Sequence, residues 1–270
     1  MNIRKHTMSF HPNTISIIPI TGIPEIKPGD HLVKIVADAV FEQDISLTNG
    51  DIIVLAQKII SKAEGRLVKL SDVSPSPFAV QIASELNKDP RFVEVILGET
   101  KRIVKMDRRS DRGMLIVETK HGIICANAGI DASNVSGGDT VTLLPINPDE
   151  SAKKLAEGFK EKLGVGVAVI ITDTVGRPWR DGLTEIAIGC GGMKPFKDYR
   201  GQSDLKGYTL SATLLAVADE IAGAAGLVMG KNDSVPVVIV RGYPYEKGGT
   251  GAKELIRKPE DDLFRWVRLL

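Results

Sequence analysis

The chain has 270 residues, of which 43% are hydrophobic and 26% charged, and its 35 Lys and Arg nearly balance its 34 Asp and Glu. This length allows one large domain or two smaller ones with a substantial core. Near-neutral charge and only 5% aromatic residues give no electrostatic or stacking basis for nucleic-acid binding. No apolar run is long enough to span a membrane, and residues 1–13 lack the hydrophobic segment of a signal peptide. We therefore expect a cytoplasmic protein without nucleic-acid or membrane partners.

Apolar periodicity and turn residues predict the elements of the first half in chain order. We expect a strand at 15–20, a loop at 21–24, a helix at 31–42 and a buried strand at 52–56. An apolar and basic segment at 57–66 is followed by two short helices at 78–86 and 90–98. A strand pair at 101–107 and 114–120, joined by a charged loop, precedes a short buried strand at 122–126.

The second half is expected to begin with a helix at 151–163, for which Ser151 is a plausible N-cap. A buried strand at 167–172, a long apolar helix at about 209–229 and a core strand at 235–240 complete the pattern. Strands and helices are mixed without regular alternation, which favours a mixed α+β fold with two lobes over a doubly wound Rossmann sheet. There is no G-x-x-x-x-G-K-[ST] motif, so a P-loop is also excluded.

Two carboxylates follow strongly apolar runs. Asp131 lies in the small-residue segment 127–134, Asn-Ala-Gly-Ile-Asp-Ala-Ser-Asn, and Asp173-Thr174 directly follows the run at 167–172. Carboxylate and amide oxygens are ligands that Mg²⁺ or Mn²⁺ prefers. Asp and Asn are also common at strand ends because they form turns and cap helices. Spacing alone leaves both interpretations open.

Several other groups are compatible with phosphate binding. Lys58 and Lys62 follow a core strand, Arg177 and Arg180 follow Asp173-Thr174, and Lys231 follows the long apolar helix. Loops beyond core strands commonly carry binding sites, although surface cations often serve only solubility. Together with the two Asp residues, these cations suggest metal-assisted handling of a nucleotide triphosphate.

Other motifs have simpler interpretations. The segment Gly248-Gly249-Thr250-Gly251-Ala252-Lys253 only faintly resembles a phosphate cradle, and a flexible loop is the preferred interpretation. Cys125 and Cys190 lie in apolar surroundings and are expected to be buried free thiols. The four histidines show no metal-ligand spacing, which makes zinc improbable.

The motifs in their order resemble the γ-glutamyl ligases of the deazaflavin coenzyme F420. The resemblance is carried by 60–66 (ISKAEGR), 127–134, 171–180 (ITDTVGRPWR), 217–222 (VADEIA) and 240–242 (VRG). It spans about 15–245 and implies a single ligase domain over 1–270 with a two-lobed γ-glutamyl ligase-type fold. Some actinobacterial relatives carry an additional flavin-type, nitroreductase-like domain after this one. Because the chain stops at Leu270, we expect that second activity to be missing.

The resemblance implies a homodimeric, GTP-dependent ligase that needs Mn²⁺ or Mg²⁺ and is helped by K⁺. Such enzymes attach L-glutamate to F420-0 and extend a γ-linked polyglutamate tail through an acyl phosphate. The positions that match metal ligands are Asp131, Asp173 and Thr174. Lys62, with Arg177 or Arg180, is expected to offset negative charge during catalysis.

The positions that match the nucleotide site form three groups. They are Ile23, Pro24, Glu25 and Ile26; Gln57, Lys62 and Asn134; and Gly226, Leu227, Val228, Met229, Gly230, Lys231, Asn232 and Asp233. In some relatives a carboxylate after the Met-Gly of the last group also contacts metal. This chain has Lys231 there, so that metal contact is not carried over, and Lys231 could face phosphate instead. Gln57 also replaces a hydroxyl residue of relatives.

Two alternatives stay open. The first is a GTP- and metal-dependent ligase or kinase that uses another carboxylate acceptor. The second is a non-catalytic nucleotide-binding regulator. Retention of both Asp131 and Asp173 argues against the regulator, because a pure binder has less need for paired metal ligands.

Overall fold

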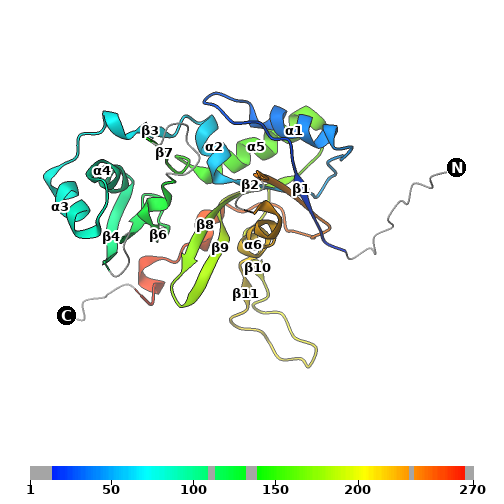
Figure 1. Cartoon of the computed structure of the whole chain (residues 1–270). Helices are drawn as coiled ribbons and strands as arrows, with labels where there is room; N and C mark the ends of the chain where they lie inside the picture. The colour runs from blue at the N-terminus through cyan, green and yellow to red at the C-terminus, as the bar shows by residue number, and fades with distance from the viewer. Residues whose placement is uncertain (1–13, 109–112, 132–138, 231–233, 265–270) are drawn as a thin grey trace.

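The computed structural model describes residues 14–108, 113–131, 139–230 and 234–264 (Figure 1). The helices are α1 (Leu32–Glu42), α2 (Gln57–Ala63), α3 (Pro77–Leu86), α4 (Pro90–Gly98), α5 (Pro148–Leu163) and α6 (Val217–Met229). The strands are β1 (Ser16–Ile20), β2 (Ile52–Ala56), β3 (Leu67–Lys69), β4 (Thr100–Asp107), β5 (Met114–Thr119), β6 (Ile124–Ala126), β7 (Thr140–Thr142), β8 (Ala168–Arg177), β9 (Arg180–Gly191), β10 (Lys197–Asp198), β11 (Leu214–Leu215) and β12 (Val237–Arg241). None of the described helices is long and apolar enough to cross a membrane.

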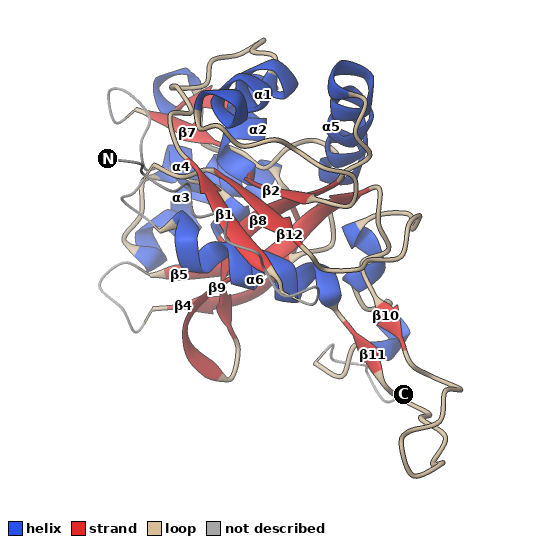
Figure 2. Cartoon of the chain, turned by 90° about the vertical axis from the view of Figure 1, so that its right-hand side faces the viewer, coloured by secondary structure: helices blue, strands red, loops and turns tan. Residues whose placement is uncertain are grey.

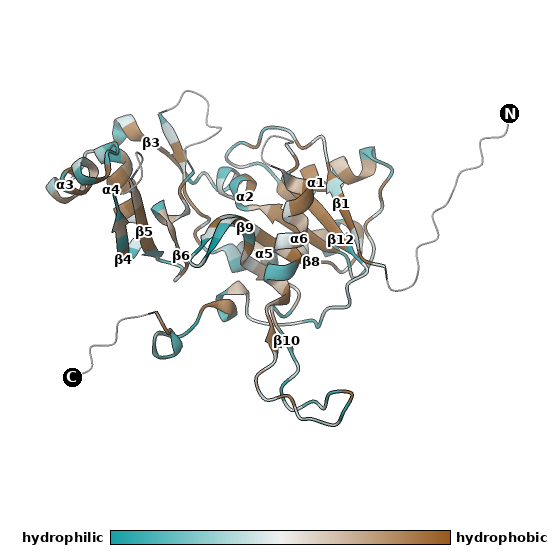
Figure 3. Cartoon of the chain, turned by 60° about the horizontal axis from the view of Figure 1, so that its bottom comes forward, coloured by the Kyte–Doolittle hydropathy of each residue, from teal (hydrophilic) through white to brown (hydrophobic). Residues whose placement is uncertain are grey.

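A five-stranded mixed sheet in the order β1-β12-β2-β8-β9 forms the centre of the molecule. Only β2 and β8 are parallel; the other neighbours are antiparallel. The apolar runs of β2, β8 and β12 are buried on both faces, as expected for strands covered by helices on each side. Figure 3 shows this hydrophobic colouring on the strands of the sheet.

Helices α1, α2 and α5 cover one face of this sheet, and α6 covers the other (Figure 2). One core cluster joins Ile53 and Ile171 to Val36 of α1 and Phe159 of α5. The second joins residues of the opposite parity, such as Ile170, to the apolar face of α6. This alternation follows from the two-residue period of a strand.

The connection from β2 to β8 contains a second lobe with its own core. β3 and β7 pair antiparallel where the chain enters and leaves this lobe. Between them, α3 and α4 pack beside the β4-β5-β6 sheet over a third apolar cluster. After this inserted lobe the chain returns to the central sheet. The path of this return determines which side chains meet where the lobe and the sheet adjoin.

The prediction of a mixed α+β fold, distinct from a Rossmann or P-loop sheet, is confirmed. Strand 52–56 and helix 90–98 are found as predicted, and helices 31–42 and 78–86 begin at 32 and 77. Helix α5 begins at Pro148, because the Asn147 side chain accepts from the Glu150 N–H and Pro is favoured in a first turn. Ser151 is therefore not its N-cap.

Three further expectations are wrong in detail. The apolar helix expected at 209–229 begins only at Val217; residues 209–215 belong to an arm that projects between β10 and β11 (Figure 2). The strand expected to end at Thr172 continues to Arg177, because β9 pairs with it along that length. Strand β6 is an edge strand with Ile124 46% exposed, so it is not buried throughout.

Candidate functional site

A cavity of about 1250 Å³ lies at the junction of the central sheet and the inserted lobe. Its walls come from the loop after β1, the start of α2, the segment after β6, the hairpin β8-β9 and the end of α6. The parallel strands β2 and β8 run toward it, and β2 gives way to α2 at Gln57. The volume exceeds the roughly 300–1,000 Å³ typical of single small-ligand sites, so the cavity has room for more than one small molecule.

The inserted lobe contributes Asp131. Asn127 and Ala128 adopt left-handed φ values of 51° and 57°, which turn the chain out of β6. Asp131 is then held by two backbone hydrogen bonds with Thr142, 3.0 Å from its N–H to the Thr142 carbonyl and 2.8 Å in return. These bonds attach the backbone of Asp131 to β7, where the lobe rejoins the body, and so hold this residue at the cavity wall.

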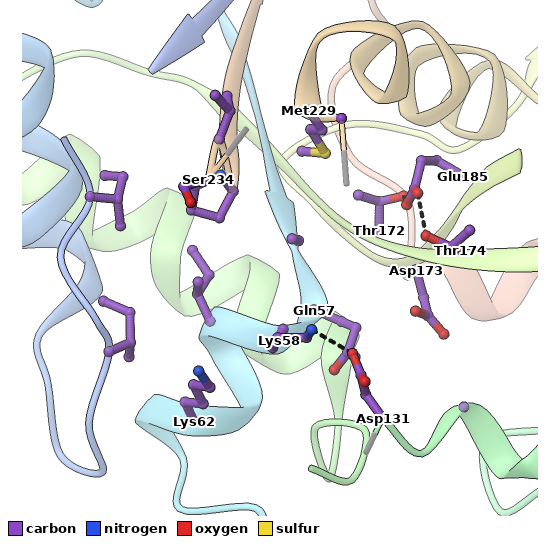
Figure 4. Close-up of a pocket in the computed structure, with 18 of the residues that line it drawn as sticks. Gln57, Lys58, Lys62, Asp131, Thr172, Asp173, Thr174, Glu185, Met229 and Ser234 are labelled. Carbon is purple, nitrogen blue, oxygen red and sulfur yellow. Dashed lines mark hydrogen bonds and ion pairs between the residues drawn. The ribbon is translucent and has the colours of Figure 1, made fainter. Parts of the chain in front are cut away.

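Strand β8 contributes Asp173 and Thr174. Thr172 is the last residue of β8 that pairs with β2, at Ala56. Beyond that point β8 pairs only with β9, so its other edge is open to the cavity. Figure 4 shows Asp131 and Asp173 in the same part of the cavity, although Asp131 follows β6 and Asp173 belongs to β8. The structure thus brings together the two carboxylates that the sequence placed far apart.

Helix α2 contributes two cations. Lys58 Nζ lies 2.5 Å from Asp131 Oδ2, with both side chains about one-quarter exposed. Lys62 Nζ lies 2.6 Å from Glu25 Oε1; the Lys62 side chain is 8% exposed, whereas that of Glu25 is 70% exposed. Gln57 is buried, and its Oε1 accepts a 2.8 Å hydrogen bond from the Ser61 hydroxyl.

The sequence did not predict a role for Glu185, a fourth acidic residue that lines the cavity beside Glu25, Asp131 and Asp173. It lies on β9 opposite Thr174 and accepts hydrogen bonds from the hydroxyls of Thr174 and Thr172 (Figure 4). A register shift between Gly176 and Arg177 alters the count of residues from the turn to this pair. Sequence spacing therefore gives no reliable signal for this partnership.

The predicted site residues divide into those that line the cavity and those that do not. The lining residues are Ile23, Pro24, Glu25, Ile26, Gln57, Lys62, Asp131, Asp173, Thr174, Met229 and Gly230. Gly226, Leu227 and Val228 lie in α6 outside the lining, with Leu227 82% exposed. The predicted positions Asn134, Lys231, Asn232 and Asp233 lie outside the described residues.

Arg177 and Arg180 lie at the turn of the β8-β9 hairpin, also outside the cavity lining. The Arg177 guanidinium donates to the Asp181 carbonyl within that turn. Their role in offsetting charge stays a prediction that would require the hairpin to move or substrate to extend toward it.

The glycine-rich segment 248–253 has a structural partner. Asp149, in the first turn of α5, accepts from the backbone N–H of Ala252 at 2.6 Å and of Lys253 at 3.2 Å. A Cβ at Gly251 would lie 2.1 Å from Asp149 Cγ, so this close approach requires glycine. This segment thus encloses a carboxylate of the protein itself.

Both cysteines are buried free thiols, as expected. Burial, and secondly the negative charge of Asp173, raise the pKa of the Cys125 thiol to about 12. Burial and the charges of Asp149 and Glu254 do the same for Cys190. A neutral thiol is a poor nucleophile, which leaves the chemistry of the cavity to its oxygen and nitrogen groups.

The donor set of the cavity fits a hard divalent cation. Asp131, Asp173 and Thr174 offer carboxylate and hydroxyl oxygens, the ligand types of Mg²⁺ and Mn²⁺. Within the described ranges, no group of three or more His, Cys, Asp or Glu side chains is close enough to hold a metal by itself. Mg²⁺ commonly uses one or two carboxylates together with substrate phosphates, and this donor set suits that mode.

Known proteins resemble this chain over most of its length. Residues 21–242 match the family model described as F420-0:Gamma-glutamyl ligase. A protein of Methanothermobacter thermautotrophicus named Coenzyme F420:L-glutamate ligase is 45% identical over 254 residues, which cover 93% of this chain and 99% of that relative. Relatives of the same name from Methanopyrus kandleri and Archaeoglobus fulgidus are 42% and 41% identical, each over 93% of this chain and over 98% and 96% of their own lengths.

Proposed function

The chain belongs to the F420-0:gamma-glutamyl ligase family, and from this premise we propose that it uses GTP and a divalent cation to join L-glutamate to F420-0. Membership makes the protein a ligase of coenzyme F420 biosynthesis. GTP dependence, an acyl-phosphate intermediate and extension of a γ-linked tail are the further parts of the proposal.

One observation carries this proposal: Asp131 and Asp173 line one cavity with Lys58 and Lys62. Carboxylates that can hold a cation and ammonium groups that can contact phosphates are both required for phosphoryl transfer. The chain brings them together from the inserted lobe, β8 and α2. No single element supplies both kinds of group.

The proposed reaction has two steps. A carboxylate oxygen of the acceptor attacks the γ-phosphorus of GTP, and the bond to the β-phosphate oxygen breaks, which gives an acyl phosphate and GDP. The deprotonated amine of L-glutamate then attacks the acyl carbon and displaces inorganic phosphate, which leaves an amide. The amine proton passes to solvent. Activation is needed because a carboxylate does not condense with an amine in water.

The side chains of the cavity would have distinct tasks in these steps. Asp131, Asp173 and Thr174 would hold Mn²⁺ or Mg²⁺, which when bound neutralises charge on the phosphates. Lys62 would contact a phosphate or the acidic acceptor once its ion pair with Glu25 is broken. Residues 23–26 and Gln57 line the same cavity and would contact the nucleotide.

Mass spectrometry of F420-0 incubated with the protein, GTP, L-glutamate, Mn²⁺ and K⁺ tests the proposal. Mass increments of whole glutamyl units that depend on GTP support it and count the tail. Loss of one charge-stabilising group commonly costs about 3 kcal/mol in a transition state. We therefore expect Asp131→Asn and Asp173→Asn each to lower turnover by a factor on the order of 100 or more, while both variants stay folded.

Asp38→Asn is the matched control, because Asp38 also pairs with a lysine, Lys34, but on the exposed face of α1. It should turn over like the wild type. Wild-type turnover by either site variant would refute the metal assignment. GTP consumption with another acid and none with F420-0 would favour the other-acceptor alternative, and binding without any turnover would favour the regulator.

Three remaining parts of the proposal need separate measurements. Omission of K⁺ should lower the rate if K⁺ assists the reaction. Light scattering on the purified protein tests the homodimer, with a monomer mass as the contrary result. Fractionation of cells tests the predicted cytoplasmic location.

A further inference from the structure

Glu185 is held between a strand and a helix at the wall of the cavity. Its backbone pairs with Thr174 in the β8-β9 hairpin, so both side chains lie on the same face. The Thr174 hydroxyl donates to Glu185 Oε1, and the Thr172 hydroxyl lies 3.0 Å from Glu185 Oε2. Each carboxylate oxygen therefore receives one hydroxyl from the neighbouring strand.

The two threonines depend on Glu185 to different degrees. Thr172 is 1% exposed, and its hydroxyl also lies 2.9 Å from the Ile186 carbonyl oxygen. This hydroxyl keeps an acceptor if the Glu185 carboxylate is removed. Thr174 lines the cavity, and the acceptor of its hydroxyl hydrogen is Glu185. Glu185 thus has its larger effect on Thr174.

Helix α6 confines Glu185 from the other side. A Cβ built on Gly226 would lie 2.7 Å from Glu185 Cγ and 3.4 Å from its Cβ. Non-bonded carbons do not approach to 2.7 Å without displacement, so any larger residue at position 226 would shift Glu185 or the helix. The absence of a side chain at Gly226 therefore allows α6 to pack directly against Glu185.

We propose that Glu185 is a positioning residue of the ligase site, which acts by accepting the hydroxyl hydrogen of Thr174. A hydroxyl has one hydrogen and two lone pairs. When the hydrogen is directed at Glu185, the lone pairs of Thr174 Oγ1 are directed elsewhere and can serve a cation in the cavity. Partners that orient ligands in this way typically change metal affinity or activity by 10- to 100-fold. This inference rests on the proposed function.

Chemically distinct substitutions separate positioning from a direct role of charge. Glu185→Met removes both acceptor oxygens while it keeps the length of the side chain. Glu185→Gln removes the charge but keeps one oxygen that can accept from Thr174. Its amide N–H can meanwhile donate to Thr172, whose own hydrogen turns to the Ile186 carbonyl. Positioning therefore predicts that Gln largely retains function and that Met does not.

The primary measurement is the affinity of the protein for Mn²⁺ in the presence of GDP, followed by the electron paramagnetic resonance signal of free Mn²⁺. It needs no acceptor and no turnover. Glu185→Met and Thr174→Val should each weaken Mn²⁺ binding by about 10- to 100-fold. The double variant should be no weaker than Thr174→Val alone, because the two residues act as one unit. Thr174→Ser keeps the hydroxyl and should bind nearly as the wild type does.

Glu94→Met is the matched control. Glu94 Oε2 accepts from the Ser76 hydroxyl at 2.6 Å in the inserted lobe, outside the cavity lining. This substitution removes the same kind of carboxylate–hydroxyl contact and should leave Mn²⁺ affinity unchanged. If Glu185→Met does not fold, Glu185→Asp supplies the same test, because it keeps the charge but withdraws the carboxylate by one methylene. It should weaken Mn²⁺ binding.

Three results would overturn the inference. The first is wild-type Mn²⁺ affinity in Glu185→Met, and the second is a loss of Mn²⁺ affinity in the double variant that equals the product of the two single losses. The third is an equal loss of Mn²⁺ affinity in Glu185→Gln and Glu185→Met. Kinetic assays add a second contrast, since the same variants should lower kcat/KM for the ligation. If the wild type binds Mn²⁺ and GDP but forms no glutamyl product, the proposed function fails while the coupling of Glu185 to Thr174 is still measured. Normal ligation by the wild type, together with unchanged Mn²⁺ affinity and unchanged kcat/KM in the Glu185 variants, would leave the proposed function intact. It would refute the positioning role of Glu185.

Discussion

Replacement of Lys58 by methionine is expected to strengthen Mn²⁺ binding to the nucleotide-free protein. Lys58 Nζ lies 2.5 Å from Asp131 Oδ2, and the two side chains are 25% and 27% exposed. A cation that uses Asp131 must compete with this ammonium group. Methionine keeps most of the apolar stem of lysine but removes its charge, so it removes the competitor with little change in packing.

The size of the effect follows from the partial exposure of the pair. In bulk water two unit charges at this separation attract by about 1.7 kcal/mol. Desolvation and side-chain ordering reduce the net contribution of such pairs to about 1 kcal/mol or less. Because about 1.4 kcal/mol corresponds to tenfold in affinity, Lys58→Met should bind Mn²⁺ up to about fivefold more tightly.

The assay is a titration of nucleotide-free protein with Mn²⁺, read from the resonance signal of the free ion. Lys34→Met is the control, because Lys34 pairs with Asp38 at 2.7 Å on the exposed face of α1, and it should change nothing. With GTP present, Lys58→Met should bind Mn²⁺ more weakly than the wild type does. The variant then lacks the positive charge that Lys58 places beside the phosphates of the nucleotide. Unchanged or weaker Mn²⁺ binding in nucleotide-free Lys58→Met would refute the competition.

Two further predictions concern the stability and reactivity of the fold. Asp51 is 1% exposed and its carboxylate receives two hydrogen bonds from Arg241, at 2.8 and 2.7 Å. Arg241→Met removes the cationic partner of this buried carboxylate, a loss that commonly costs about 3–5 kcal/mol. Because the Arg241 side chain is 35% exposed and Asp51 still accepts from the Thr48 N–H and hydroxyl, we expect about 3 kcal/mol. Calorimetry should then show Tm lowered by roughly 6–12 °C, and a change below about 2 °C would contradict the reasoning. Burial raises the pKa of Cys125 and Cys190 from 9.0 to about 12, which lowers the thiolate fraction at pH 8 about 1,000-fold. Iodoacetamide should therefore modify both thiols only after unfolding in guanidinium, and rapid labelling of the native protein would show that they are accessible.

Local sequence patterns were sufficient for many of the elements. The apolar run at 52–56 predicted β2 because both faces of that strand are covered by helices. The start of α5 was misplaced at Ser151, although Asn147 and Pro148 carry a capping signal. The helix expected from 209 was too long, because apolar residues of the arm continued its pattern without packing on the sheet. Periodicity records which residues are apolar but not what covers them.

The candidate site was determined partly by sequence and partly by topology. The sequence by itself identified Asp131 and Asp173 as carboxylates after apolar runs, and the family motifs around them. Only the tertiary structure decided that they share a cavity, because the inserted lobe must return through the β3-β7 pair to bring Asp131 beside β8. The place of Glu185 in the candidate site was decided by the tertiary structure alone. Its link to Thr174 depends on the register of the β8-β9 hairpin, which shifts between the turn and this pair. A register is set by the packing of both strands, which no local pattern contains.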